Sequence, residues 1–565
     1  MQALVTLENV SFTYRQRSRP TISDINLQVA AGDFLLLTGA TGCGKSTLLK
    51  TLNGLLPHES GGLLTGRVII DGRDSRSCSI ASLSRHVGMV FQSPDDQIFS
   101  TTVFDETAFV LENSGVTGVG LKARVDEALA MVGLLDKRDA SVHALSGGQK
   151  QRLAVASVLA ARPKVLALDE PISQLDPQGA AELLAVLRQI NATLGITVII
   201  VEHRLHEVMP LCQRVVVMDA GRIVWQGSQE EAFARAELFA AHGLRLPQPV
   251  TICARLGIRL ASAQVEAAAA AIRERYTVTA CEALPPPENA CGEPALTVDG
   301  VCFRYQEKGE LILNMIRLTL AKGQFIALMG SNGAGKSTLL HVIGGLLQPA
   351  AGQVLLGGDR VGGITPRIGM VLQNPDFMLF NSSVRQEIGF ACSQAAGRTV
   401  WTETCEAVSV HLGLQPLADD FPLALSRGQR LRVAIAAVLA SQPEVLLLDE
   451  PTTGQDIGHI EDIAALLGDF TAQGGTIIFC THDGEVAARY ADRVIVMRQG
   501  RIAADAPPAE VFSRPALLLA AGLKPPAALQ LAQRLYGGQS LTAEEVIDYV
   551  RQNSLGSDAG LNPAT

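Results

Sequence analysis

The feature that most constrains this 565-residue chain is a glycine-rich segment that occurs twice. The first copy is Gly39-Ala-Thr-Gly-Cys-Gly-Lys-Ser-Thr47, and the second is Gly330-Ser-Asn-Gly-Ala-Gly-Lys-Ser-Thr338. Other segments recur around them in the same order; Leu7–Tyr14, for example, returns as Thr297–Tyr305. A repeat that preserves the order of its segments predicts two duplicated domains, each with its own core.

Each glycine-rich loop has the surroundings of a phosphate-binding loop (P-loop). It follows a continuous apolar run, Phe34–Thr38 or Phe325–Met329, which is typical of a buried parallel strand, and it opens a predicted helix. Glycines let backbone N–H groups turn toward phosphate oxygens, and the helix N-terminus favours negative charge. The lysine would reach the β- and γ-phosphates, and the next serine would ligate Mg²⁺. The predicted phosphate-binding residues are Gly39, Gly42, Gly44, Lys45, Ser46 and Thr47, with Gly330, Gly333, Gly335, Lys336, Ser337 and Thr338 in the second copy.

Two further apolar runs end in a pair of acidic residues. They are Lys164–Glu170 and Glu444–Glu450, and each has Asp-Glu-Pro at its end. A strand that ends in acidic residues is common, but beside a P-loop it indicates a Mg·ATP site, where one carboxylate holds the metal and the other polarises the attacking water. The predicted metal ligands are therefore Asp169 and Asp449, and the predicted catalytic bases are Glu170 and Glu450.

A third repeated segment precedes each acidic pair. It reads Leu145-Ser-Gly-Gly-Gln-Lys-Gln-Arg152 in the first copy and Leu425-Ser-Arg-Gly-Gln429 in the second. With the loops and acids, the first version resembles the signature sequence of the ATP-binding cassette (ABC) family, and the resemblance covers most of the chain. It implies an α/β fold of two tandem P-loop ATPase domains, each with a helical signature subdomain and a small C-terminal helical extension. It also implies that each ATP lies between the P-loop of one half and the signature of the other. The signature residues assigned to ATP are Ser146, Gly147, Gly148 and Gln149, with Ser426, Gly428 and Gln429 in the second copy.

The resemblance assigns further residues in matching positions of both copies. An aromatic residue near the first strand would stack on adenine, although a core aromatic at a strand end is the alternative. A glutamine would sense Mg²⁺ and the attacking water, and a histidine after an apolar strand would contact the γ-phosphate, although a lone histidine there is often structural. The loops Ser173–Asp176 and Thr453–Asp456 match the loop that couples the two sites. The aromatic residues are Tyr14 and Tyr305, the glutamines Gln92 and Gln373, and the histidines His203 and His482.

The second signature departs from the family pattern at Arg427, where the first copy has glycine. In a helical first turn its charge would oppose the helix dipole by about 0.3–1 kcal/mol, which a bound phosphate could offset. Because each ATP is expected to lie between the P-loop of one half and the signature of the other, Arg427 would affect the site that uses Lys45, Glu170 and His203. A tolerated substitution without functional asymmetry is the alternative.

The segments after the two glutamines resemble those of energy-coupling-factor (ECF) transporter ATPases. They read Gln92-Ser-Pro-Asp-Asp-Gln-Ile-Phe99 and, less closely, Gln373-Asn-Pro-Asp-Phe-Met-Leu-Phe380. The resemblance implies a groove for a helix of a membrane-embedded coupling subunit, which works with a substrate-capture subunit in import of a vitamin, a vitamin precursor or a transition-metal ion. A solvated acidic loop is the alternative. The residues expected to receive an arginine of the partner are Asp95, Asp96 and Asp376.

Two other machines use tandem ABC domains. Sugar importers usually lack Pro-Asp-Asp-Gln-Ile-Phe after the glutamine, and soluble factors that act on ribosomes carry a long, highly charged helical linker. The region 243–293 is instead rich in Ala and Pro. A net charge of −9 does not favour nucleic acid as a partner. These alternatives remain open.

Neither a signal peptide nor an 18-residue apolar window is found, which predicts a soluble or peripheral protein. The ECF resemblance implies a peripheral position at the cytoplasmic face of the membrane. Cys43 lies inside the first loop, which predicts that a thiol reagent blocks phosphate binding and that ATP protects. Leu284–Pro287 is a predicted stiff linker and Leu555–Thr565 a predicted frayed tail. The predicted division is a first ATPase domain at 1–235, a helical extension and linker at 236–292, a second ATPase domain at 293–508, and a C-terminal extension and tail at 509–565.

Overall fold

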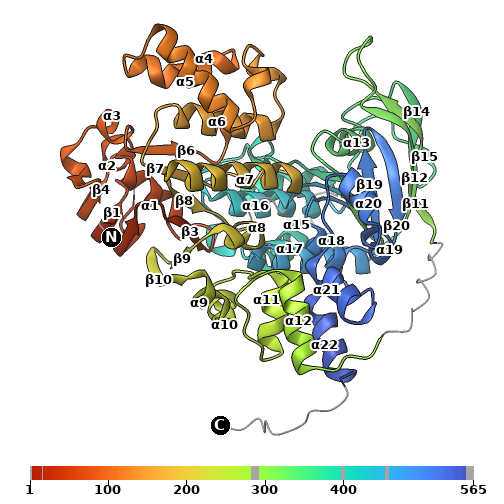
Figure 1. Ribbon diagram of the computed structural model, residues 1–565. Coiled ribbons are helices and arrows are strands. Elements are labelled where there is room, and N and C mark those ends of the chain that lie inside the picture. The colour runs from red at the N-terminus through yellow and green to blue at the C-terminus, as the bar shows by residue number, and fades with distance from the viewer. Residues whose placement is uncertain (1–2, 16, 281–291, 396–400, 452–456, 555–565) are drawn as a thin grey trace. The chain divides into compact units, whose positions relative to one another are not determined.

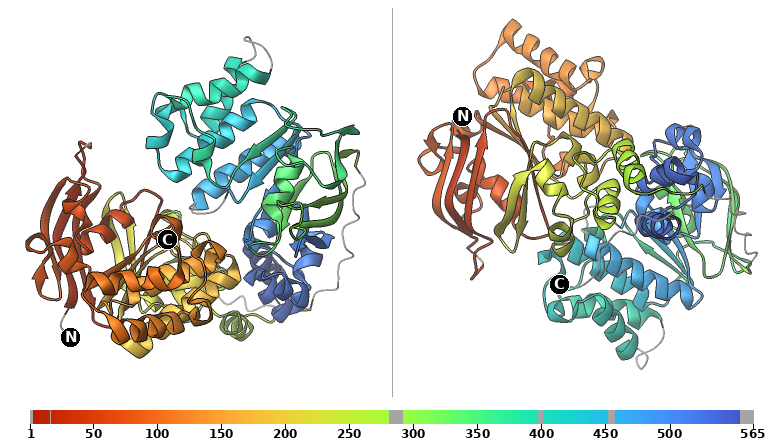
Figure 2. Two further views of the ribbon diagram at one scale, coloured as in Figure 1. Left: turned by 90° about the horizontal axis from the view of Figure 1, so that it is seen from above. Right: turned by 60° about the horizontal axis from the view of Figure 1, so that its bottom comes forward.

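A computed structural model of the chain describes residues 3–15, 17–280, 292–395, 401–451 and 457–554 (Figures 1 and 2). The expected linker Leu284–Pro287, the coupling loop Thr453–Asp456 and the tail from Leu555 lie outside these residues. Contacts divide the chain into two units. One comprises Met1–Val250 and Arg259–Ala263, and the other comprises Thr251–Ile258 and Gln264–Thr565.

The first unit is built on a six-stranded sheet that places the P-loop strand β3 among parallel neighbours. The strand order is β10-β9-β3-β8-β7-β6; β3 is parallel to β8 and β9, β7 is parallel to β6 and β8, and β10 pairs antiparallel with β9. Carboxyl ends of parallel strands meet at one edge, where ligands bind in such sheets. The strands are β3 (Phe34–Gly39), β6 (Val87–Val90), β7 (Val165–Asp169), β8 (Thr197–Val201), β9 (Arg214–Asp219) and β10 (Arg222–Ser228).

The central strands are apolar on both faces because both faces are covered. In β7, Leu166 and Leu168 belong to the core beneath the helices, whereas Val165 and Ala167 belong to the core beneath a second sheet. This explains why the sequence shows a continuous apolar run at β7 instead of alternation. The covering helices include α1 (Lys45–Leu52), α6 (Gly147–Leu159) and α7 (Pro177–Leu194), and α4 (Val103–Asn113) and α5 (Gly118–Met131) pack on α6.

The second sheet is antiparallel in the order β2-β1-β4-β5. Alternate residues of β1 and β2, such as Val5, Leu7 and Ile25, are buried against the P-loop sheet. The sheet therefore shows the one-sided burial expected of an antiparallel sheet with a solvated face. Its strands are β1 (Ala3–Thr13), β2 (Ile22–Ala30), β4 (Leu63–Ile70) and β5 (Arg73–Asp74).

The second unit repeats both sheets strand for strand. The orders are β12-β11-β14-β15 and β16-β17-β18-β13-β19-β20. The α/β fold predicted from the duplicated sequence is thereby confirmed. The strands are β11 (Pro294–Phe303), β12 (Leu313–Ala321), β13 (Phe325–Met329), β14 (Ala351–Leu356), β15 (Asp359–Arg360), β16 (Ile368–Val371), β17 (Val445–Asp449), β18 (Thr476–Cys480), β19 (Arg493–Arg498) and β20 (Arg501–Ala506); the helices include α13 (Lys336–Ile343), α14 (Val384–Ala395), α15 (Trp401–His411), α16 (Arg427–Ala440) and α17 (Ile457–Ala472).

The helical extensions of both sequence halves meet in the second unit. Helix α12 (Val265–Arg275) packs on α21 (Ala527–Tyr536), which packs on α22 (Ala543–Gln552) (Figure 1). Glu266 forms a 2.5 Å ion pair with Arg534 of α21. The segment that follows the first ATPase domain therefore folds partly with the second unit.

In the part of the chain that is described, no helix combines the length and the apolar character needed to cross a membrane.

Candidate nucleotide-binding site

The glycines of each P-loop are required by the backbone that the loop adopts. Gly39 and Gly44 have φ values of 153° and 104°, in the region that L side chains rarely adopt. A Cβ on Gly39 would lie 2.1 Å from the carbonyl oxygen of Met218, and one on Gly330 would lie 2.4 Å from that of Met497. Both loops can therefore form only with glycine at these places, which agrees with their predicted function of turning N–H groups toward phosphate.

The lysine and serine of each loop lie as a nucleotide site needs them. The Lys45 ammonium donates to the carbonyls of Gly39 and Ala40, both at 2.9 Å, and Lys336 makes the equivalent bonds in the second unit. The Ser46 hydroxyl donates to Oδ1 of Asp169 at 3.0 Å. The structure thus brings together two of the predicted metal ligands of the first site, Ser46 and Asp169, directly after the predicted phosphate-binding lysine.

A network links the predicted base of the first unit to two other predicted residues. Oε1 of Glu170 lies 3.0 Å from Nε2 of His203, and Oε2 accepts a 2.9 Å hydrogen bond from Nε2 of Gln92. Glu170 directly follows β7, His203 follows β8 at one residue's distance, and Gln92 follows β6, so three neighbouring parallel strands deliver the three side chains to one edge. Glu170 has a φ of +47°, a conformation of the kind that clusters at functional sites.

The second unit has a looser version of this network. Glu450 shows the same unusual backbone, with a φ of +49°. Its Oε2 lies 3.6 Å from Nδ1 of His482, and its Oε1 lies 4.0 Å from the Lys336 ammonium. Gln373 is exposed, whereas Gln92 in the first unit is half-buried. The two predicted sites therefore differ in geometry.

The carboxylates at the ends of β7 and β17 suit a cation. Burial, followed by the charge of Glu170, raises the pKa of Asp169 to about 6, and burial also raises the pKa of Asp449. Oδ1 of Asp449 is buried without a hydrogen-bond partner in the described part of the chain. No cluster of three or more metal-type side chains occurs among the described residues. The unpartnered carboxylate oxygen fits Mg²⁺, which is commonly held by one or two carboxylates together with substrate phosphates.

Each predicted signature serine caps a helix. Ser146 accepts from the backbone N–H of Gln149 at 3.3 Å, and the Gln149 side chain accepts from the backbone of Ser146 at 2.9 Å. Ser426 makes the same capping box at the start of α16. Arg427 is the first residue of α16, so the position is helical. A Cβ on its counterpart Gly147 would meet nothing within 4 Å, which explains why a side chain is tolerated there.

The predicted adenine-stacking tyrosines lie beside the P-loop helices. The Tyr14 hydroxyl is 3.3 Å from Oγ1 of Thr47, and the Tyr305 hydroxyl is 3.2 Å from Oγ1 of Thr338. Tyr305 is 63 % exposed, so it is not a core aromatic residue.

Cys43 is less accessible than the sequence suggests. Its side chain is buried, and burial raises the pKa of its thiol. Because the thiolate is the nucleophile, we do not expect ready alkylation of Cys43 in the folded protein. This argues against the prediction that a thiol reagent at Cys43 blocks phosphate binding.

Two of the three acidic residues predicted to receive a partner's arginine are already paired within their own unit. Asp95 lies 2.6 Å from the Lys150 ammonium, and Asp376 lies 2.6 Å from Nε of Arg430. Asp96 is exposed and has no ion pair among the residues described.

Sequence analysis missed a buried glutamate that anchors this segment in both units. Glu106 accepts the backbone N–H groups of Phe99 and Ser100 at 3.1 and 2.9 Å, and Glu387 accepts those of Phe380 and Asn381 at 2.9 and 2.8 Å. The repeat carried the signal, because Phe and Glu recur with the same spacing in 99–106 and 380–387.

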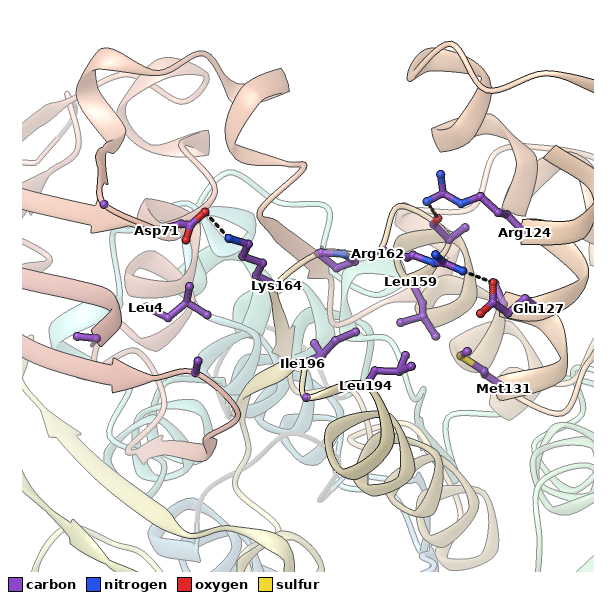
Figure 3. Close-up of a pocket in the computed structure, with 17 residues that line it drawn as sticks. Leu4, Asp71, Arg124, Glu127, Met131, Leu159, Arg162, Lys164, Leu194 and Ile196 are labelled. Carbon is purple, nitrogen blue, oxygen red and sulfur yellow. Dashed lines mark hydrogen bonds and ion pairs between the residues drawn. The ribbon is translucent and has the colours of Figure 1, made fainter. Parts of the chain in front are cut away.

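A cavity of about 820 Å³ in the first unit is separate from this site. Figure 3 shows the ion pair of Asp71 with Lys164 on one side and that of Arg162 with Glu127 on the other. Lys164 and Ile196, which line the cavity, precede β7 and β8, whereas the acidic pair and His203 follow these strands. The cavity and the predicted nucleotide site therefore lie at opposite ends of the sheet.

Comparison with known proteins decides the family. The model described as "ABC transporter" matches residues 22–173 and 313–453, which are the P-loop-to-acid segments of both units. The chain belongs to the ABC transporter family.

The relatives of this ABC protein resemble it along nearly their whole length. It is 40% identical to a putative ABC transporter ATP-binding protein of Methanosarcina acetivorans, over 98% of this chain and 92% of the relative. It is 37% identical to one of Streptomyces avermitilis, over 90% of this chain and 94% of the relative. Among solved structures, cbiO1 of Clostridium perfringens, described as part of the ABC transporter complex cbiONQ, is 35% identical and covers 45% of this chain and 99% of its own, with a TM-score of 0.39. The chain is thus an ATPase with two ABC transporter ATP-binding domains.

Proposed function

We propose that this ABC ATPase hydrolyses Mg·ATP with the predicted residues of both units and powers an ECF-type importer. In each unit the P-loop lysine would bind the β- and γ-phosphates, and the loop serine, the first acid and the glutamine would hold Mg²⁺. The second acid polarises the attacking water, and the histidine contacts the γ-phosphate. The linked side chains of Gln92, Glu170 and His203 carry this proposal.

We further propose that each ATP joins the P-loop of one unit to the capped signature helix of the other. Ser146 and Ser426 each cap a helix whose N-terminal N–H groups form an anion site. Loss of the γ-phosphate removes the bridging charge, which converts hydrolysis into separation of the units.

The ECF assignment is supported by the segment from Gln92 to Phe99. Phe99 and Phe109 are both exposed and pack edge to face, and Phe380 and Phe390 form the same pair in the second unit. Exposed aromatic side chains are typical anchors at protein interfaces. Beside the first pair, the exposed carboxylate of Asp96 can receive an arginine. The expected partners are a membrane-embedded coupling subunit and a substrate-capture subunit, with a vitamin, vitamin precursor or transition-metal ion as cargo.

Co-purification from solubilised membranes tests this function. The full chain should retain membrane subunits, and Asp96→Arg should weaken that retention through charge repulsion. Asp136→Arg is the matched control, because Asp136 is also an exposed aspartate of the first unit. Recovery of ribosomal particles, or equal retention by both variants, would count against the ECF assignment. Removal of Mg²⁺ with a chelator should abolish ATP turnover in either case.

A further inference from the structure

Glu202 is a buried carboxylate to which the proposed mechanism gives no role. It follows β8 directly and is 1% exposed. Its Oε1 accepts the backbone N–H of Ile172 at 2.9 Å, and its Oε2 accepts the backbone N–H of His203 at 3.2 Å. The carboxylate therefore bridges the loop after β7 and the loop after β8.

These two loops carry the reactive pair of the first site. Glu170 lies two residues before Ile172, and its carboxylate faces the His203 ring at 3.0 Å. The guanidinium of Arg204 donates to the carbonyls of Ile172 and Leu175 at 3.0 and 2.9 Å. The backbone at Ile172 is thus held through its N–H by Glu202 and through its carbonyl by Arg204, just after a residue with positive φ.

The second unit has a different residue in this place, and the counterpart of Ile172, residue 452, lies outside the described residues. Thr481 replaces Glu202 after β18 and is also 1% exposed, but its hydroxyl accepts the N–H of Asp483 in its own loop at 3.0 Å. The contact between Glu450 and His482 in the second unit is 3.6 Å, against 3.0 Å between Glu170 and His203 in the first. A carboxylate in this place is costly, since burial and then the charge of Glu170 raise the pKa of Glu202 to about 8. Threonine shows that the fold does not need it.

We propose that Glu202 is a positioning residue that sets the geometry of Glu170 and His203 in the first site by tying their loops together. The inference rests on the proposed function of Glu170 and His203. A carboxyl group suits the task because each of its two oxygens carries lone pairs and can accept an N–H group, whereas a glutamine side chain offers one acceptor oxygen.

The test uses the full chain with Glu450→Gln, so that the remaining turnover comes from the first site. In this background Glu202→Thr should lower kcat for ATP about tenfold and leave KM within about twofold, because the loss affects alignment and not phosphate binding. Glu202→Gln keeps one acceptor and should lose only about threefold. Thr481→Val is the matched control in the other unit and should leave kcat unchanged.

The outcomes distinguish failure of the proposed role of Glu202 from failure of the proposed catalytic role of Glu170. Unchanged kcat in both Glu202 variants overturns the proposal, and so does a loss confined to KM. If Glu202→Thr does not fold, the nearly isosteric Glu202→Gln decides alone. Glu170→Gln in the same background tests the first site itself. If this variant keeps ATP turnover, the proposed function of the first site fails. If Glu170→Gln is inactive but Glu202→Thr is fully active, only the proposed role of Glu202 is refuted.

Discussion

Replacing Asp169 with asparagine should stabilise the nucleotide-free protein at neutral pH, although it removes a proposed metal ligand. Burial, followed by the charge of Glu170, raises the pKa of Asp169 from 3.8 to about 6, so the folded state favours the neutral acid and the ionised form destabilises it. Asparagine is neutral and keeps an oxygen that can accept the hydroxyl of Ser46. The substitution therefore removes the buried charge without removing this hydrogen bond.

The magnitude follows from the shift in pKa. A shift of roughly two units corresponds to about 3 kcal/mol between the ionised and neutral forms. The stability that neutral Asp169 provides is fully present below its unfolded pKa of 3.8 and is lost as the pH rises through about 6. The advantage of Asp169→Asn should therefore grow from about 1 kcal/mol at pH 4.5 to about 3 kcal/mol at pH 7.5. For a unit of this size, the latter is roughly 6–12 °C in unfolding midpoint.

Differential scanning calorimetry with a chelator and without nucleotide measures this difference. Asp136→Asn, which changes an exposed aspartate of the same unit, is the control and should leave the midpoint nearly unchanged. The reasoning is refuted if Asp169→Asn unfolds at or below the wild-type midpoint at pH 7.5, or if its advantage increases as the pH falls. Addition of Mg·ATP should favour the wild type, since only it retains the proposed metal ligand.

Three further predictions concern other parts of the two sites. Glu106→Ala removes the buried carboxylate that accepts two backbone N–H groups and should destabilise the first unit by about 2–3 kcal/mol in urea titration. Glu387→Ala should do the same in the second unit, and an unchanged urea midpoint in either would contradict the anchoring role. Cys43 should resist iodoacetamide at pH 7.5 until the protein is unfolded, as followed by mass spectrometry, and fast labelling of the native chain would disprove its burial. Glu450→Gln should suppress steady-state ATP turnover more than Glu170→Gln does, because the proposed site that contains Glu170 also uses the signature with Arg427 and should be the weaker one. Equal losses of turnover would argue for equivalent sites.

The fold could be predicted wherever a physical requirement is written locally in the sequence. The apolar runs predicted as buried strands at Phe34–Thr38 and Phe325–Met329 are β3 (Phe34–Gly39) and β13 (Phe325–Met329), because strands buried on both faces must be apolar throughout. The helical extension predicted in the region 509–565 contains α22 (Ala543–Gln552), whose buried residues Ala543, Val546, Ile547 and Val550 follow the helical period.

Contacts between distant elements could not be predicted from the sequence. The pairing of Asp95 with Lys150 joins residues on different elements, and no local pattern specifies it. Glu202 looks like an ordinary charged residue beside His203, and only the fold shows that it is buried against the loop after β7. The accessibility of Cys43 was misjudged for the same reason, since burial depends on side chains packed around the loop.

The packing of α12 on α21 has a consequence for how the two halves stay associated. Helix α12 precedes residues 281–291 in the chain, and α21 follows them, yet both fold in the second unit. A protease cut between residues 281 and 291 would sever the polypeptide without separating these helices. The two sequence halves are then connected both by the polypeptide chain and by the packing of α12 on α21. A version of this protein expressed as two polypeptides divided at that segment should therefore reassemble by itself.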